Sequence, residues 1–144
     1  MRVRALAGAV ACTLCLISSG VSAQMTIVVE DTAKEAVGGR LAFAIKERIR
    51  RSAGFELVGA RADALFRFSL VTLDDKSGYS TVYSAVFSAW QPETGTWTYL
   101  HNLVGTCGTN RIAECADGLV ADADKTAEEP RAYYRAYFKN REKK

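Results

Sequence analysis

The stretch "ALFRFSLVTLDDKSGYSTVYSAVFSAWQPETGTWTYLHNLVGT", residues 64–106, decides the predicted fold of this chain. It contains three runs rich in β-branched and aromatic residues, which the turn sequences "DDKSG" at 74–78 and "QPETG" at 91–95 separate. Strands that are joined by short turns pair in the antiparallel sense. The stretch therefore predicts a three-stranded antiparallel meander with strands at 64–73, 79–90 and 97–106.

The predicted strands alternate between an apolar face and a more polar one. In the first strand Phe66, Phe68 and Leu70 share a face, whereas Arg67 and Ser69 point the other way. In the second strand, serines at 80, 84 and 88 dominate the face opposite the aromatic residues. We expect helices to cover the apolar face and to leave the serine-bearing face partly open. That open face is a candidate binding surface, or simply the consequence of having only two helices to cover the sheet.

Upstream of the meander, the sequence predicts a strand at 25–30, a long helix at 33–53 and a short strand at 54–59. Along the helix, apolar residues recur every fourth position and form one stripe, at Val37, Leu41, Ile45 and Ile49. Thr32, with Glu35 three residues later, has the spacing of a capping box at the start of this helix. Gly54 suits a left-handed helix end.

Two adjacent glycines, Gly38 and Gly39, are unexpected inside this helix. Each costs on the order of 1 kcal/mol relative to alanine in a helix interior. The surrounding sequence lacks both the spacing of a dinucleotide-binding fingerprint and the lysine of a phosphate-binding loop. The pair therefore indicates close packing against the sheet, or a helix that starts later than the apolar stripe suggests.

Downstream of the meander, a helical pattern runs through Ile112, Cys115 and Leu119, and Pro130 can open another helix at 131–140. Together the elements predict the α+β class. We expect one domain at 24–144, with a mainly antiparallel sheet of about five strands and two to three helices packed on one face of it.

The amino terminus has the pattern of a signal peptide. Arg2 and Arg4 precede an apolar run at 5–17, and the small residues Val21-Ser22-Ala23 follow. A membrane anchor would need about 20 apolar residues, more than this run offers. Neither Cys12 nor Cys15 follows the leucine-small-small sequence of a lipidated cysteine. We therefore predict cleavage after Ala23 and a protein that is periplasmic or secreted, without an integral membrane span.

Removal of residues 1–23 takes away two of the 19 Lys and Arg residues and none of the 16 acidic ones, so the remaining chain has a net charge of +1. A balance this close to zero gives no indication of a nucleic-acid partner. Removal of residues 1–23 also leaves only two cysteines, Cys107 and Cys115. In an exported chain an even pair predicts a disulfide. Zinc would need two further ligands, and a thioredoxin-type redox pair would have two intervening residues in place of seven.

Groups that could support catalysis or metal binding are few. His101 is the single histidine and alternates with Trp97 and Tyr99 along its strand, yet the sequence has no Gly-x-Ser-x-Gly nucleophile elbow. The turn at 74–78 lacks the alternating ligands and the terminal glutamate of a calcium loop. The acidic residues Asp117, Asp122 and Asp124 are typical of a solvated helix face. We expect no catalytic residue, no metal and no cofactor.

Two segments are candidate contacts for a partner. Asn110 and Arg111 lie at the centre of the loop that the predicted disulfide closes. The carboxyl-terminal segment at 131–144 combines aromatic residues at helical spacing with many cations, and its candidate contact residues are Tyr134, Arg135 and Phe138. The aromatic stripe can cap the core of the domain, or the segment can bind a partner groove or touch an anionic membrane surface peripherally.

The order of elements resembles the periplasmic domain of the TolB amino-terminal region, of LpoB-type activators of cell-wall synthases and of the curli-channel protein CsgG. A helix ends before the short strand at 54–58, Ala62-Asp63 introduces the next strand, and a turn with Thr94-Gly95 separates two later ones. The resemblance covers roughly residues 25–106 and concerns the fold. It implies an envelope protein that docks to other macromolecules, and it transfers no functional residue.

These observations predict a non-catalytic exported envelope protein that acts by protein–protein binding or assembly, with one or more envelope proteins as partners. The alternative is a secreted or periplasmic inhibitor of an enzyme of the lysozyme or protease type, which would use Asn110 and Arg111 as its contact. A small hydrolase would require a nucleophile and a pocket close to His101.

Overall fold

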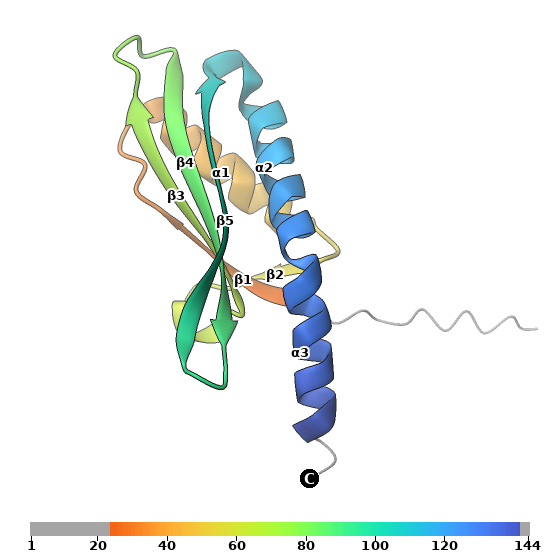
Figure 1. Cartoon of the computed structure of the whole chain (residues 1–144). Helices are drawn as coiled ribbons and strands as arrows, with labels where there is room; N and C mark the ends of the chain where they lie inside the picture. Colours follow the sequence, from red (N-terminus) through yellow and green to blue (C-terminus); the bar gives the residue numbers. More distant parts are fainter. Residues whose placement is uncertain (1–23, 142–144) are drawn as a thin grey trace, which may run out of the picture.

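The structure, a computed structural model, describes residues 24–141. The predicted signal peptide, with Cys12 and Cys15, and residues 142–144 lie outside the described residues. The described chain forms one α+β domain, as predicted (Figure 1). Its elements are, in order, β1 (Met25–Asp31), α1 (Ala36–Arg50), β2 (Phe55–Leu57), η1 (Arg61–Asp63), β3 (Phe66–Asp74), β4 (Ser80–Gln91), β5 (Thr96–Gly108), η2 (Thr109–Arg111), α2 (Ile112–Thr126) and α3 (Glu128–Arg141).

The five strands form one sheet in the order β2-β1-β3-β4-β5. The predicted meander is confirmed, because β3 pairs antiparallel with β4 and β4 with β5. The sheet as a whole is mixed, since β1 pairs parallel with both β2 and β3. Parallel pairing follows from the connection, because α1 returns the chain to the end of the sheet where β1 began.

The hydrophobic core lies between the sheet and the helices α1 and α2, which cover one face of it (Figure 1). The aromatic centre of the core comprises Phe66, Phe68 and Phe87, all fully buried. The ring centroid of Phe87 lies 6.0 Å from that of Phe66 and 4.9 Å from that of Phe68. The predicted apolar stripe of α1 packs against this centre with Leu41, Ile45 and Ile49.

Helix α1 begins at Ala36, later than predicted, and the capping box at Thr32 and Glu35 does not form. The backbone N–H of Thr32 instead bonds to the carbonyl of Leu70 in β3, at 3.0 Å. The Glu35 carboxylate accepts hydrogen bonds from the hydroxyls of Thr72 (3.0 Å) and Thr81 (2.5 Å). Burial alone would raise the pKa of Glu35, but these hydrogen bonds lower it below its ordinary value. A sheet contact has therefore replaced the local cap.

Gly38 makes this contact possible. A Cβ atom at position 38 would lie 2.1 Å from Glu35 Oε1 and 2.3 Å from Thr72 Oγ1. The predicted close packing thus holds at Gly38, whereas a Cβ at Gly39 would meet no atom within 4 Å.

We expect opposite effects from alanine at these two neighbouring positions. Gly38→Ala displaces the Glu35 carboxylate from its hydroxyl partners and should lower the free energy of unfolding by about 2 kcal/mol, because hydrogen bonds to charged groups contribute roughly 1.5–3 kcal/mol. Gly39→Ala should raise it by up to about 1 kcal/mol through helix propensity alone. Urea unfolding of both variants measures this difference. Equal effects at the two sites would contradict the role given to Gly38.

At the other end of α1, the predicted left-handed helix end is wrong, because Gly54 does not have a positive φ. The missing side chain of Gly54 instead allows the guanidinium of Arg131 to approach the backbone, since a Cβ at position 54 would lie 2.7 Å from a guanidinium nitrogen of Arg131. Arg131 donates to the carbonyl of Gly54 at 3.2 Å, pairs with Asp124 at 2.6 Å and lies over the ring of Phe55. This arginine of the carboxyl-terminal segment therefore joins α3 and α2 to the segment around β2.

The predicted disulfide joins Cys107 and Cys115, with 6.2 Å between their Cα atoms. It connects the end of β5 to the first turn of α2, as predicted. Helix α3 follows α2 after a break at Ala127 and includes Pro130 in its first turn. Within residues 24–141, no helix has the length and apolar content needed to cross a membrane.

Candidate functional site

The face of the sheet opposite α1 and α2 carries an apolar cluster, formed by Val71 and Leu73 of β3, Val82 of β4 and Val104 of β5. We call these four residues the open-face cluster. The strand register places them near one another, because Leu73 is paired with Val82, while Val71 and Val104 are both paired with Ser84. Adjacent strands lie about 4.8 Å apart, so Val71, Leu73 and Val82 are direct neighbours, and Ser84 separates Val71 from Val104.

The members of the open-face cluster are unusually exposed for aliphatic residues. Their exposed fractions are 47% for Val71, 67% for Leu73, 36% for Val82 and 70% for Val104. Single exposed apolar residues are ordinary, but a contiguous group on an uncovered face is typical of an interaction surface. Arg67 and Ser69, which the sequence analysis placed on this face, lie nearer the start of β3 and are partly buried.

Strand β5 forms the edge of the sheet beside this cluster. Its sequence, "TWTYLHNLVGTCG", contains no Asp, Glu, Lys, Arg or Pro. Natural proteins protect long edge strands with such residues, because an unpaired edge is a template for another strand. Apart from one bulge, the β5 edge carries none of these protective residues.

The bulge in β5 corrects the prediction for His101. The register shifts between the residues that pair with Phe87 and Ser88, so His101 is paired with Phe87 and faces the helix side. Tyr99 is paired with Ser88 on the open face. His101 therefore does not share a side with Trp97 and Tyr99, because the extra residue reverses the alternation between them.

The predicted contact residues Asn110 and Arg111 lie in η2 and are exposed. Thr109, which precedes them, bonds to the carbonyl of Tyr79 through its backbone N–H (2.7 Å) and its hydroxyl (2.8 Å). Tyr79 is 77% exposed and leads into β4. Asn110 and Arg111 therefore lie at the same end of the sheet as Leu73 and Val82.

The other predicted contact residues lie on α3 and differ in accessibility. Tyr134 is 4% exposed, and its hydroxyl contacts the carbonyl oxygens of Leu65 (3.0 Å) and Trp90. Burial raises the pKa of Tyr134 to about 12. Its side chain therefore caps the core and is not a surface contact. Arg135 is exposed, and Phe138 is 46% exposed.

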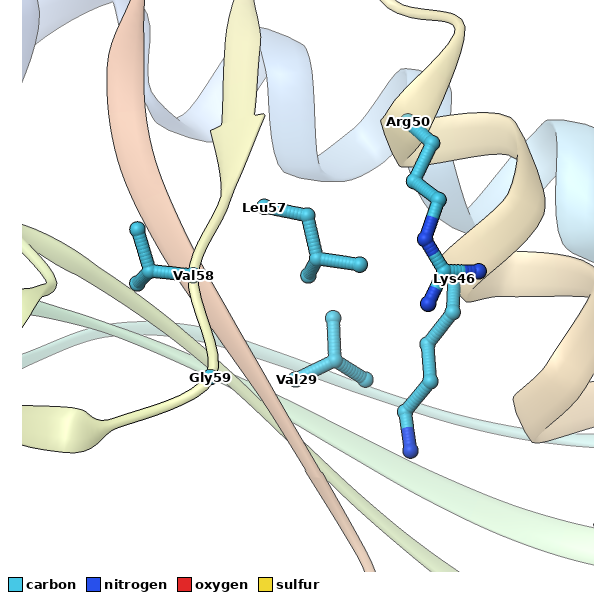
Figure 2. A pocket seen from close by; sticks show the side chains of 6 residues that line it. All are labelled: Val29, Lys46, Arg50, Leu57, Val58 and Gly59. Atoms are coloured by element: carbon cyan, nitrogen blue, oxygen red, sulfur yellow. The ribbon is translucent and has the colours of Figure 1, made fainter.

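A pocket of about 280 Å³ lies between α1 and the strands β1 and β2, and Figure 2 shows its lining. Its walls are apolar at Val29, Leu57 and Val58, and Lys46 and Arg50 reach over it from α1. Both cations have acidic partners, since Lys46 pairs with Asp31 at 2.7 Å and Arg50 pairs with Glu47. The lining contains no hydroxyl, thiol or carboxylate group, and its one amine, that of Lys46, is paired with Asp31.

In the part of the chain that the structure describes, no three His, Cys, Asp or Glu residues are grouped so that they could hold a metal ion. Two of the three aspartates of α2 named above, Asp117 and Asp124, take part in ion pairs with other helices. Asp117 pairs with Arg48 of α1, and the guanidinium lowers the pKa of that carboxyl below its ordinary value. Asp124 pairs with Arg131. These pairs join α2 to its neighbouring helices.

The open-face cluster was not among the site residues predicted from the sequence, although the signal was present. Along "FRFSLVTL" the alternation that puts Phe66, Phe68 and Leu70 in the core also puts Val71 and Leu73 on the opposite face. Val82 was not predicted because it lies between Ser80 and Ser84 on a strand face that the sequence analysis described by its serines. A count of apolar residues on both faces would have found the cluster.

No protein-family model and no curated protein matches the sequence. Among solved structures, the hypothetical protein CT253 from Chlamydia trachomatis matches with a TM-score of 0.50 and 9% identity over 72% of this chain and 98% of that chain. The PelC dodecamer from Paraburkholderia phytofirmans matches with a TM-score of 0.42 and 16% identity over 73% and 86%. Rare lipoprotein B from Shewanella oneidensis matches with a TM-score of 0.29 and 13% identity over 83% and 99%. The likeness to CT253 concerns the fold alone.

Proposed function

We propose that this chain is an exported envelope protein without catalytic activity, which binds another envelope protein through the open face of β3, β4 and β5. The observation that carries the proposal is the open-face cluster. Four exposed aliphatic side chains lie on neighbouring strands, on the face of the sheet that α1 and α2 do not cover. In water this surface is unfavourable, at roughly 25 cal/mol per Å² of exposed apolar area, and a partner that covers it recovers that free energy.

The edge strand supports the same surface. A partner segment in an extended conformation can add to β5 through backbone hydrogen bonds and place alternate side chains over Val104. The absence of charged side chains along β5 means that such a segment meets no buried unpaired charge. The partner we infer is therefore a protein with an extended, mainly apolar binding segment.

Export is supported by two independent features. The amino-terminal sequence has the pattern of a signal peptide, and the disulfide between Cys107 and Cys115 is of a kind that persists in oxidising compartments. Both features favour the periplasm or the extracellular space as the place where the partner is met.

The proposal predicts that charge on the open face abolishes binding. The double variant Leu73→Glu/Val104→Glu should lose about 100-fold or more in affinity for the envelope partner, because burying each aliphatic side chain contributes about 1.5–3 kcal/mol. Its thermal unfolding should stay close to that of the wild type, since both side chains are largely exposed. Chemical cross-linking in envelope extract, followed by quantitative mass spectrometry, identifies the partner and measures its loss.

Phe43→Glu is the matched control for this experiment. Phe43 is 65% exposed, close to the 67% of Leu73, but lies on α1 and thus on the helix layer. The control should retain the partner. Loss of the partner with Phe43→Glu, or its retention with the double variant, would refute the assignment to the open face.

The alternative function, inhibition of an exported enzyme of the lysozyme or protease type, is favoured by one observation. The disulfide closes the loop that contains η2, Thr109 of η2 bonds to Tyr79 just before β4, and Asn110 and Arg111 are exposed. The same cross-linking experiment separates the two functions. An enzyme captured by the wild type, lost with Arg111→Glu and retained with the open-face variant would support inhibition.

A further inference from the structure

Charge is unevenly distributed along the part of the chain that follows the predicted signal peptide. Residues 131–144 contain six Lys or Arg residues and one acidic residue, a net charge of +5. Residues 24–130 contain 11 basic and 15 acidic residues, a net charge of −4. The net charge of this part of the chain is therefore close to zero because an acidic body and a basic carboxyl-terminal segment offset each other. An anionic surface repels the first and attracts the second.

The structure places the basic residues at an accessible end. Helix α3 continues beyond the layer formed by α1 and α2, and its carboxyl-terminal end lies clear of the sheet (Figure 1). Arg131 at its start is held by Asp124 and Gly54. The cations of the last two turns, Arg135, Lys139 and Arg141, are exposed.

Aromatic side chains accompany these cations. Phe138 is 46% exposed, and the ring of Tyr137 packs against it with centroids 5.4 Å apart. Between α3 and the start of β1 lies a groove of about 270 Å³ with apolar walls at Met25, Leu65 and Phe138, and Arg135 stands beside it. Aromatic residues next to cations are typical of helices that lie at a membrane interface, where the rings enter the headgroup region and the cations meet anionic lipid.

We propose that the last two turns of α3 bind the surface of an anionic phospholipid membrane. Arg135, Lys139 and Arg141 contact lipid phosphates, and Phe138 enters the interface. A cation near such a surface contributes about 1 kcal/mol, so three of them contribute about 3 kcal/mol. This surface is separate from the open face of the sheet, which remains free for a protein partner.

The test measures co-sedimentation of the protein with lipid vesicles. The protein is purified in the form that native cells contain, and its amino terminus is determined by mass spectrometry. It should bind vesicles that contain phosphatidylglycerol and not vesicles of phosphatidylcholine alone, and salt should weaken the binding. The triple variant Arg135→Gln/Lys139→Gln/Arg141→Gln should bind about 100-fold more weakly, at 1.4 kcal/mol per tenfold change. Phe138→Ala should cost about tenfold.

The control triple variant Lys34→Gln/Arg40→Gln/Lys76→Gln removes the same charge from exposed positions elsewhere and should bind like the wild type. Equal binding to both kinds of vesicle, or equal loss in both triple variants, would overturn the proposal. Binding of soluble polyphosphate through the same three cations, without binding of vesicles, would assign the segment to an acidic polymer instead. The triple variant of α3 should still bind the protein partner, and the double variant Leu73→Glu/Val104→Glu should still bind vesicles. Failure of the membrane proposal can therefore be distinguished from failure of the proposed function.

Discussion

Phe87→Ala should lower the free energy of unfolding by about 4 kcal/mol, which is among the largest effects expected from a single substitution in this chain. Phe87 is fully buried at the centre of the sheet, and its ring packs against those of Phe66 and Phe68 from β3 and lies 6.4 Å from that of His101 in β5. Alanine would leave a cavity between sheet and helices that neighbours on paired strands cannot fill. Because domains are typically stable by about 5–15 kcal/mol, a loss of about 4 kcal/mol removes a large share of the total stability.

Phe43→Ala is the matched control for this loss. It removes the same side chain from an exposed position on α1, and its effect should stay within about 0.5 kcal/mol. Urea unfolding monitored by circular dichroism measures both variants. A cost below about 1 kcal/mol for Phe87→Ala would mean that the core is not organised around the paired phenylalanines.

Removal of the disulfide should have the next largest effect on stability. The bond between Cys107 and Cys115 closes a loop with a sequence separation of 8, and the chain-entropy relation for a loop of this length gives about 2.5 kcal/mol. Cys107→Ala/Cys115→Ala should therefore lower the free energy of unfolding by about this amount, with loosening concentrated where β5 meets α2. Urea unfolding and amide hydrogen exchange measure the two effects.

Two further treatments distinguish a disulfide from a metal site. A thiol reductant should destabilise the wild type to the level of the double variant and leave that variant unchanged. A chelator should change neither protein. Two free thiols in protein recovered from its native compartment would contradict the bond and, with it, one of the two supports for export.

The meander was predictable from the sequence because its signals are local. The alternation through Phe66, Phe68 and Leu70 fixed one face of β3, and glycines at 78 and 95 mark the turns on either side of β4. The disulfide followed from counting cysteines once the amino terminus was read as a signal peptide. None of these inferences required knowledge of contacts between distant residues.

The features that the sequence did not reveal depend on contacts between distant segments. The cap of α1 was assigned to Thr32 and Glu35 because their spacing fits, but Glu35 binds Thr72 and Thr81, which become its neighbours only when the sheet forms. His101 was assigned to the wrong face because one bulge in β5 reverses the alternation. Tyr134 was a candidate contact residue, with packing on the core as the alternative, and only the structure shows the backbone acceptor at the end of β4 that its hydroxyl contacts.

The central claim is that the protein binds a partner through the open face of its sheet. Photo-cross-linking from position 73 in native cells tests this claim most directly. A photoreactive amino acid replaces Leu73 in one variant and Phe43 in another, two positions of nearly equal exposure on opposite layers of the domain. We expect a discrete envelope protein to be attached at position 73 and absent at position 43. No adduct at position 73, or the same adducts from both positions, would contradict the account.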